Sequence, residues 1–96
     1  ERPIPFDNMI YFGDGETDVP SMAVTREQGG YAVAVHQPHK GKAKCRDLFA
    51  ASRIDFYAPA DYRKGRELWR KTTLILDKMI SSIAYEKERY AEGKRS

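Results

Sequence analysis

Tyr31-Ala32-Val33-Ala34-Val35 is an unbroken apolar run in which no polar side chain alternates with the apolar ones. A strand with one face in water usually alternates, so this run predicts a strand that is covered on both faces, as strands of parallel sheets are. Gly29-Gly30 precedes it, and the segment 36–41, with Pro38 and Gly41, follows it as a loop.

On the N-terminal side, Met9–Phe12 is a short apolar run stopped by a glycine, which predicts a second buried strand. Residues 19–28 are expected to form a helix, with Met22 and Val24 facing inward. Asp18 is a good N-cap residue for this helix, and the glycine pair at 29–30 is expected to end it.

On the C-terminal side, Lys42–Ser52 has helical spacing, Ile54–Ala58 predicts a third strand, and a long helix is expected from Arg66. The apolar stripe predicted for the long helix comprises Leu68, Thr72, Ile75, Met79 and Ile83, widened by Trp69, Leu76 and Ile80. The alternation predicts an α/β fold: a three-stranded parallel Rossmann-like half-sheet with crossover helices and a long C-terminal helix.

The 96 residues suit a single domain, with 86–96 as a charged tail. Hydrophobic residues are 41% and charged residues 32%, which is typical of a globular chain and not of a disordered one. No apolar run is long enough for a membrane span. The single cysteine, Cys45, excludes an intrachain disulfide and favours a cytoplasmic protein. Because the chain begins at Glu1 without an initiator Met, we expect a fragment of a longer protein.

The net charge of +3 is unevenly distributed, with a balance of −4 over residues 1–35 and +7 over residues 36–96. A basic half is one feature of nucleic-acid-binding domains. The bases are interrupted by acids and lack the interleaved aromatic residues of a stacking surface, so we interpret them as solvated helix faces and expect no nucleic-acid partner.

The segment Gly13–Asp18 leaves the first predicted strand and enters the first predicted helix, at the edge where open parallel sheets bind ligands. Asp14 and Asp18 can converge across so tight a loop, and the glycines at 13 and 15 allow the backbone to turn sharply. Carboxylate oxygens gathered at one place suit Mg²⁺. The alternative is an acidic turn in which Asp18 only caps the helix.

The stretch 11–22, Tyr-Phe-Gly-Asp-Gly-Glu-Thr-Asp-Val-Pro-Ser-Met, resembles the fourth motif of the haloacid dehalogenase-like (HAD) hydrolase superfamily. That motif is an apolar strand followed by Gly-Asp-Gly, two variable residues, Asp and a short helix. Residues 29–35 resemble the next core strand of the family, and 53–62 resemble a stretch of bacterial members of phosphatase type. The resemblance covers most of residues 3–80.

The resemblance implies an enzyme in which an Asp nucleophile takes a phosphoryl group from a small phosphorylated substrate, with Mg²⁺ as cofactor. It assigns Asp14 as a metal ligand, direct or through water, and Asp18 as the residue that positions this water or completes the shell. Gly13 and Gly15 would shape the loop. Thr17 and Asp61 are candidates for contacts to the metal ligands or the substrate.

The family's nucleophile motif, Asp-x-Asp, occurs nowhere in the sequence, and the only candidate before Gly13 for its phosphate-binding Lys is Arg2. We therefore expect no catalytic residue in this chain, and a fragment of a phosphohydrolase that is inactive alone. A non-catalytic α/β module that binds a metal or a partner is the alternative. The nucleophile strand of the family lies beside the fourth-motif strand, so we expect residues 4–12, the long helix, or both to be buried by self-association.

Three further residues could suggest a metal site: His36, His39 and Cys45. Their spacing fits no standard zinc pattern, and three ligands on one loop and helix are too few for a closed structural site. We interpret the histidines as loop residues and Cys45, which lies on an apolar helical face, as a small core residue.

Overall fold

The structure is a computed structural model that describes residues 8–95, in which strands and helices alternate. The elements are β1 (Ile10–Asp14), α1 (Val19–Glu27), β2 (Tyr31–His36), α2 (Lys42–Ala50), β3 (Phe56–Pro59) and α3 (Glu67–Arg95). The predicted α/β fold, with its long C-terminal helix, is confirmed. The charged segment 86–95 continues α3, whereas the predicted lead-in over 1–7, with Arg2 and part of the expected 4–12 contact, lies outside the described residues.

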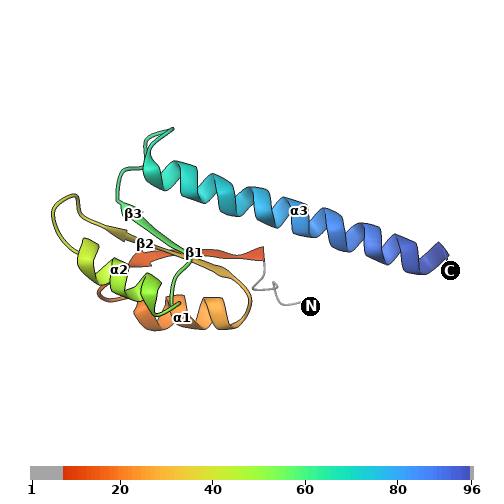
Figure 1. The fold of residues 1–96 in the computed structure, drawn as a ribbon, viewed down its shortest axis with the longest axis horizontal. Helices are drawn as coiled ribbons and strands as arrows, with labels where there is room; N and C mark the ends of the chain where they lie inside the picture. Colours follow the sequence, from red (N-terminus) through yellow and green to blue (C-terminus); the bar gives the residue numbers. More distant parts are fainter. Residues whose placement is uncertain (1–7, 96) are drawn as a thin grey trace, which may run out of the picture.

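The sheet is parallel, in the order β1-β2-β3, as the sequence predicts. Asp14 is in register with Val35, and His36 with Pro59, so the carboxyl ends of the three strands meet at one edge. Figure 1 shows α1 and α2 below the sheet and α3 crossing above it. Both faces of β2 are thus covered, which is what its uninterrupted apolar run requires.

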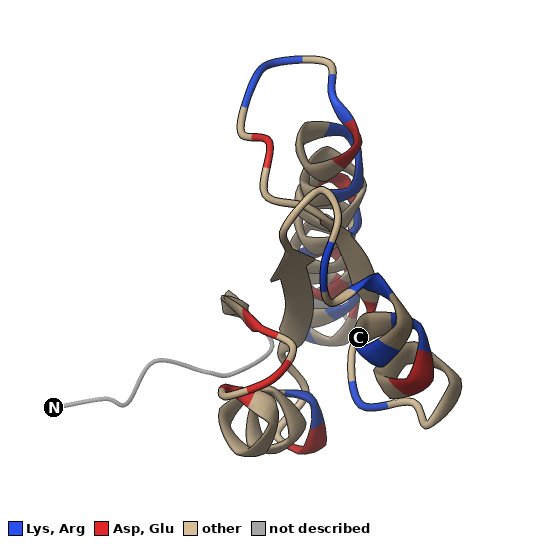
Figure 2. Cartoon of the chain, turned by 90° about the vertical axis from the view of Figure 1, so that its left-hand side faces the viewer, with Lys and Arg blue, Asp and Glu red and all other residues tan. Residues whose placement is uncertain are grey.

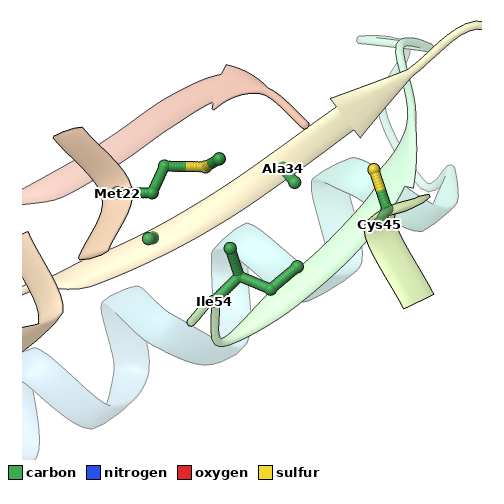
Figure 3. Close-up of a cluster of buried hydrophobic side chains, with 5 residues drawn as sticks. Met22, Ala34, Cys45 and Ile54 are labelled. Atoms are coloured by element: carbon green, nitrogen blue, oxygen red, sulfur yellow. The ribbon is translucent and has the colours of Figure 1, made fainter. Parts of the chain in front are cut away.

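The core beneath the sheet is built around Met22 of α1 and Cys45 of α2, which point toward Ala34 of β2 (Figure 3). Ile54 is buried in the same cluster, although it precedes β3, which starts two residues later than predicted. The reason is Asp55: its Oδ2 atom accepts a hydrogen bond from the backbone N–H of Ala32 at 2.7 Å. The Asp55 backbone N–H still donates to Ala32 O at 2.8 Å, so the side chain replaces only the backbone acceptor of the Ala32 N–H.

The core above the sheet contains Val33 and Ala58, covered by Leu68 and Ile75 of α3. The predicted apolar stripe of α3 is therefore only partly buried. Thr72 and Met79 are half-buried, and the remaining members are exposed: Trp69, Leu76, Ile80 and Ile83. The helix is about 44 Å long at 1.5 Å per residue and extends past the sheet, so its second half finds little surface to pack on within the described residues (Figure 1).

Both short helices end in the same hydrogen-bonded arrangement. After α1, Gly29 adopts a positive φ of 93° and the N–H of Gly30 donates to Thr25 O, as the sequence predicts for this glycine pair. After α2, Ser52 adopts φ 59° and the N–H of Arg53 donates to Leu48 O. Ser52 was expected inside the helix, but its left-handed conformation ends α2 at Ala50.

One inward-facing residue of α1 was predicted wrongly. Val24 is half exposed, whereas Thr25 is buried and donates its hydroxyl to Ser21 O. Met22 faces the sheet, and at 100° per residue Thr25 shares its side of the helix while Val24 turns away.

None of the helices within residues 8–95 is both long and apolar enough to cross a membrane.

Apolar side chains remain uncovered along β1 and α3. β1 is an edge of the sheet in the described chain, and on it Phe12 is 45% exposed because α3 crosses over the other two strands. On α3, Ile80 is 65% exposed. An open strand edge beside apolar side chains favours pairing with another chain.

We expect the purified chain to self-associate through these surfaces, as measured by light scattering across a concentration series. Leu76→Glu/Ile80→Glu should shift the chain toward monomer, because charges cannot be buried there without a partner. Ser81→Glu, on an exposed position of the same helix, is the control and should change little. A stable monomer of the unsubstituted chain at high concentration would contradict this prediction.

Candidate functional site

The loop between β1 and α1 is closed by its two aspartates. The Asp18 N–H donates to Asp14 O at 3.0 Å, and the Asp14 N–H donates to Asp18 Oδ2 at 2.8 Å. Asp14 Oδ1 in turn accepts from the Glu16 N–H at 2.6 Å. The structure thus brings Asp14 and Asp18 together, as predicted. Asp18 occupies the N-cap position, but its carboxylate makes no capping hydrogen bond to α1 and binds the start of the loop instead.

These hydrogen bonds use one oxygen of each aspartate, and each carboxylate keeps a second oxygen. The Asp14 side chain is exposed and Asp18 is partly exposed, so both can be reached from solvent. Thr17 is exposed on the same loop. Within residues 8–95, no group of three or more His, Cys, Asp and Glu side chains is placed to hold a metal ion.

Glycine at positions 13 and 15 is required by close contacts. A Cβ on Gly13 would lie 2.8 Å from both Asp18 Cβ and Tyr11 Cε1. A Cβ on Gly15 would lie 2.7 Å from Cys45 Sγ. The absence of side chains lets Asp18 fold back over the end of β1 and lets the loop lie against α2. The prediction that these glycines shape the loop agrees with this packing.

A cavity of about 190 Å³ opens where the strands end, between the β1–α1 loop and the β2–α2 loop. Figure 2 views this end of the molecule, with acidic residues on the β1–α1 loop and basic residues on the loops before α2 and α3. The polar side chains that line the cavity are those of Asp14, Glu16, His36, Gln37 and Lys40.

His36 is the site residue that sequence reasoning missed. It was expected in a loop, but it ends β2 and is only 7% exposed. Its Nδ1 lies 2.7 Å from Gln37 O. Because a carbonyl only accepts, Nδ1 carries the hydrogen, and in the neutral ring Nε2 is an acceptor. The alternation of Ala32, Ala34 and His36 on one face of the strand is the signal that could have placed it.

Cys45 lies beneath the loop as a core residue, 1% exposed. Burial, followed by the nearby carboxylates of Asp14 and Glu16, raises the pKa of its thiol. A raised pKa disfavours the thiolate, the reactive form of cysteine. The prediction of a packing role for Cys45 therefore agrees with its surroundings.

Asp61 lies beyond β3 and pairs with two arginines. Arg63 donates to it through Nε at 2.9 Å and through Nη2 at 2.8 Å, and Arg66 lies 3.7 Å away. Hydrogen bonds from Arg63 lower the pKa of the Asp61 carboxyl from its ordinary 3.8 to about 2. Asp61 lines a separate hollow near the start of α3, whereas its neighbour Ala60 lines the cavity at the strand ends.

Comparison with known proteins adds one relative. An uncharacterised protein of Borreliella burgdorferi is 30% identical over 84 residues, which are 86% of this chain and 28% of that protein. The chain thus spans little more than a quarter of the length of this relative. No protein-family model and no solved structure matches the chain.

The close packing of Gly15 on Cys45 gives a stability prediction. Gly15→Ala should lower the free energy of unfolding by about 1–3 kcal/mol, because its Cβ has no room beside the thiol. Cys45→Ala removes the obstructing sulfur, so the double variant should lose less than the sum of the two single variants. Urea denaturation of the four proteins measures this coupling, and strict additivity would contradict it.

The Asp61 pair gives a pH prediction. A carboxyl whose pKa is lowered by folding stabilises the folded state above its unfolded pKa, and this contribution disappears as the pH falls from about 4 to about 2. Asp61→Asn should therefore lower the Tm slightly at pH 7, and the difference should shrink through that window. The effect is small because the pair is exposed and screened by salt. Asp77→Asn, at an exposed position of α3, serves as the control; a difference that persists at pH 2 would exclude this explanation.

Proposed function

We propose that this chain supplies the metal-binding acids of a Mg²⁺-dependent phosphohydrolase of the HAD type, whose phosphoryl-accepting Asp lies in another part of a longer polypeptide. The observation that carries the proposal is the Asp14–Asp18 turn. The Asp18 carboxylate accepts a hydrogen bond from the Asp14 backbone N–H and the Asp14 carboxylate accepts one from the Glu16 N–H, at the carboxyl edge of a parallel sheet. Ligands of open α/β sheets bind at this edge.

The donors present suit Mg²⁺ in kind. Magnesium binds through one or two carboxylates and retains several waters, and Asp14 and Asp18 each have an oxygen outside the loop hydrogen bonds. Two carboxylates make up about half of the protein ligands of such a site, as expected if the remaining ligands come from another part of a longer polypeptide. When bound, Mg²⁺ would shield the negative charge of a phosphoryl group from that of an attacking carboxylate.

The residues of this chain would act by holding the carboxylates of Asp14 and Asp18 in fixed positions. The N–H of Glu16 fixes one oxygen of Asp14 and leaves the other outside the loop hydrogen bonds. The hydrogen bond from the Asp14 N–H holds Asp18 in the same way. Gly13 and Gly15 keep the loop close to its neighbours, so the two acids stay fixed while a substrate reacts.

The alternative is a non-catalytic α/β module that binds a metal or a partner through the same loop. The two functions differ in what precedes Glu1 in the gene. A segment encoding an apolar strand that ends in Asp-x-Asp supports the phosphohydrolase, and a gene without one supports the module.

Activity measurements test the proposal directly. The chain alone should show no turnover of an aryl phosphate with Mg²⁺, because no attacking group is in place. In the full-length protein, Asp14→Asn should lower kcat about a hundredfold or more, and Asp18→Asn should lower it less.

Thermal melting provides the control for these variants. Both aspartates lie on an accessible loop, so neither substitution should lower the Tm as much as Val33→Ala in the core. A Tm lowered equally by Asp14→Asn and Val33→Ala would assign Asp14 a structural role. Mg²⁺-dependent turnover by the 96-residue chain that Asp14→Asn abolishes would show that the missing nucleophile is not needed.

A further inference from the structure

The cavity at the strand ends is lined by a largely buried histidine, one of whose ring nitrogens makes no hydrogen bond within the described residues. His36 is more than nine-tenths buried, and its Nδ1 is occupied by Gln37 O. Within residues 8–95, no protein partner is found for Nε2, yet every fully buried side-chain nitrogen or oxygen there has one. Nε2 therefore retains some contact with solvent, and His36 is one of the residues that line the cavity.

Glu16 reaches the same space from the opposite loop. Its Oε2 lies 3.9 Å from the point where a Cβ on Gly41 would stand, and His36 Cβ lies 3.3 Å from that point. Gly41 has a φ of 93°, and its lack of a side chain leaves space between the Glu16 carboxylate and the Cβ of His36. A ligand in that space could contact both residues.

The lining determines which ligand chemistry fits. Asp14, Glu16 and the Nε2 atom of His36 are hydrogen-bond acceptors, and Lys40 is a donor. An anionic ligand would be repelled by the two carboxylates, and a ligand with an ammonium group would be repelled by Lys40. A neutral hydroxyl both donates and accepts, so vicinal hydroxyls satisfy both sides. At about 30 Å³ per water molecule, 190 Å³ admits roughly six non-hydrogen atoms, the size of a three-carbon polyol.

We propose that this cavity is a binding site for a small polyol, an alcohol with vicinal hydroxyl groups, recognised by Glu16 and by His36 Nε2. The binding stands on the cavity alone; its role as the site of the leaving alcohol of a phosphoester, next to Asp14, rests on the proposed function. In that role Glu16 and His36 determine specificity.

The test is an amide NMR titration of the 96-residue chain with glycerol, without Mg²⁺ or phosphate. Glycerol should shift the amides of Glu16, His36 and Gly41 saturably, and 1-propanol, with the same carbon skeleton and one hydroxyl, should not. Glu16→Gln should weaken binding about tenfold, through loss of a charged acceptor. Glu27→Gln, an exposed position on α1, should leave binding unchanged.

Gly41→Ala would fill the position between the two groups and should abolish binding. Its matched control is Gly65→Ala, because Gly65 also has a positive φ, of 84°, but its Cβ would meet nothing within 4 Å. If Gly41→Ala does not fold, the comparison of glycerol binding by Glu16→Gln and Glu27→Gln tests the proposal instead. No saturable shift, equal shifts with 1-propanol, or unchanged binding in Glu16→Gln would overturn the proposal. Because the titration contains no phosphoester, a failure here leaves the activity tests of the proposed function unaffected.

Discussion

The pairing of β2 on both edges and its packing on both faces constrain the rest of this structure. Ala32 and Ala34 are small enough for α1 and α2 to lie against one face, and Val33 occupies the other face beneath α3. Because β1 and β3 both run parallel to β2, all three strands end at one edge. The acidic loop, the imidazole and the cavity between them are consequences of that shared edge.

The order and type of the elements followed from the sequence because apolar runs and glycines mark them locally. Element ends were less predictable where a side chain or an unusual backbone conformation decides them. The carboxylate of Asp55 accepts one of its two hydrogen bonds with Ala32 at the start of β3, and Ser52 adopts a left-handed conformation that a serine seldom adopts. Neither effect produces a periodic pattern. The exposure of Ile80 depends on how far α3 extends past a narrow sheet, which the spacing of apolar residues within the helix does not reveal.

The candidate site was predictable in part for the same reason. The closeness of Asp14 and Asp18 follows from a short glycine-containing turn, which is local in sequence. The cavity is not local, since it joins the ends of two strands and the loop before α2. His36 is buried only because these segments come together in the fold. In the sequence it stands at the start of a proline-containing segment, which is why we predicted a loop residue there.

Because α3 extends past the sheet, its C-terminal turns should unfold more easily than the part of the molecule that contains the sheet. The molecule is 56 Å along its longest axis, and beyond Ile83 the helix is exposed almost throughout. A helical segment of about a dozen residues is marginal in water when only its own hydrogen bonds and contacts such as Lys94 over Tyr90 support it. Opening of the last turns therefore costs little free energy, and hydrogen-exchange protection should decline from Ile75 toward the C-terminus. The sheet and the cavity stay closed during such opening, so the terminal turns of α3 can order against another surface without changing the geometry of the strand ends.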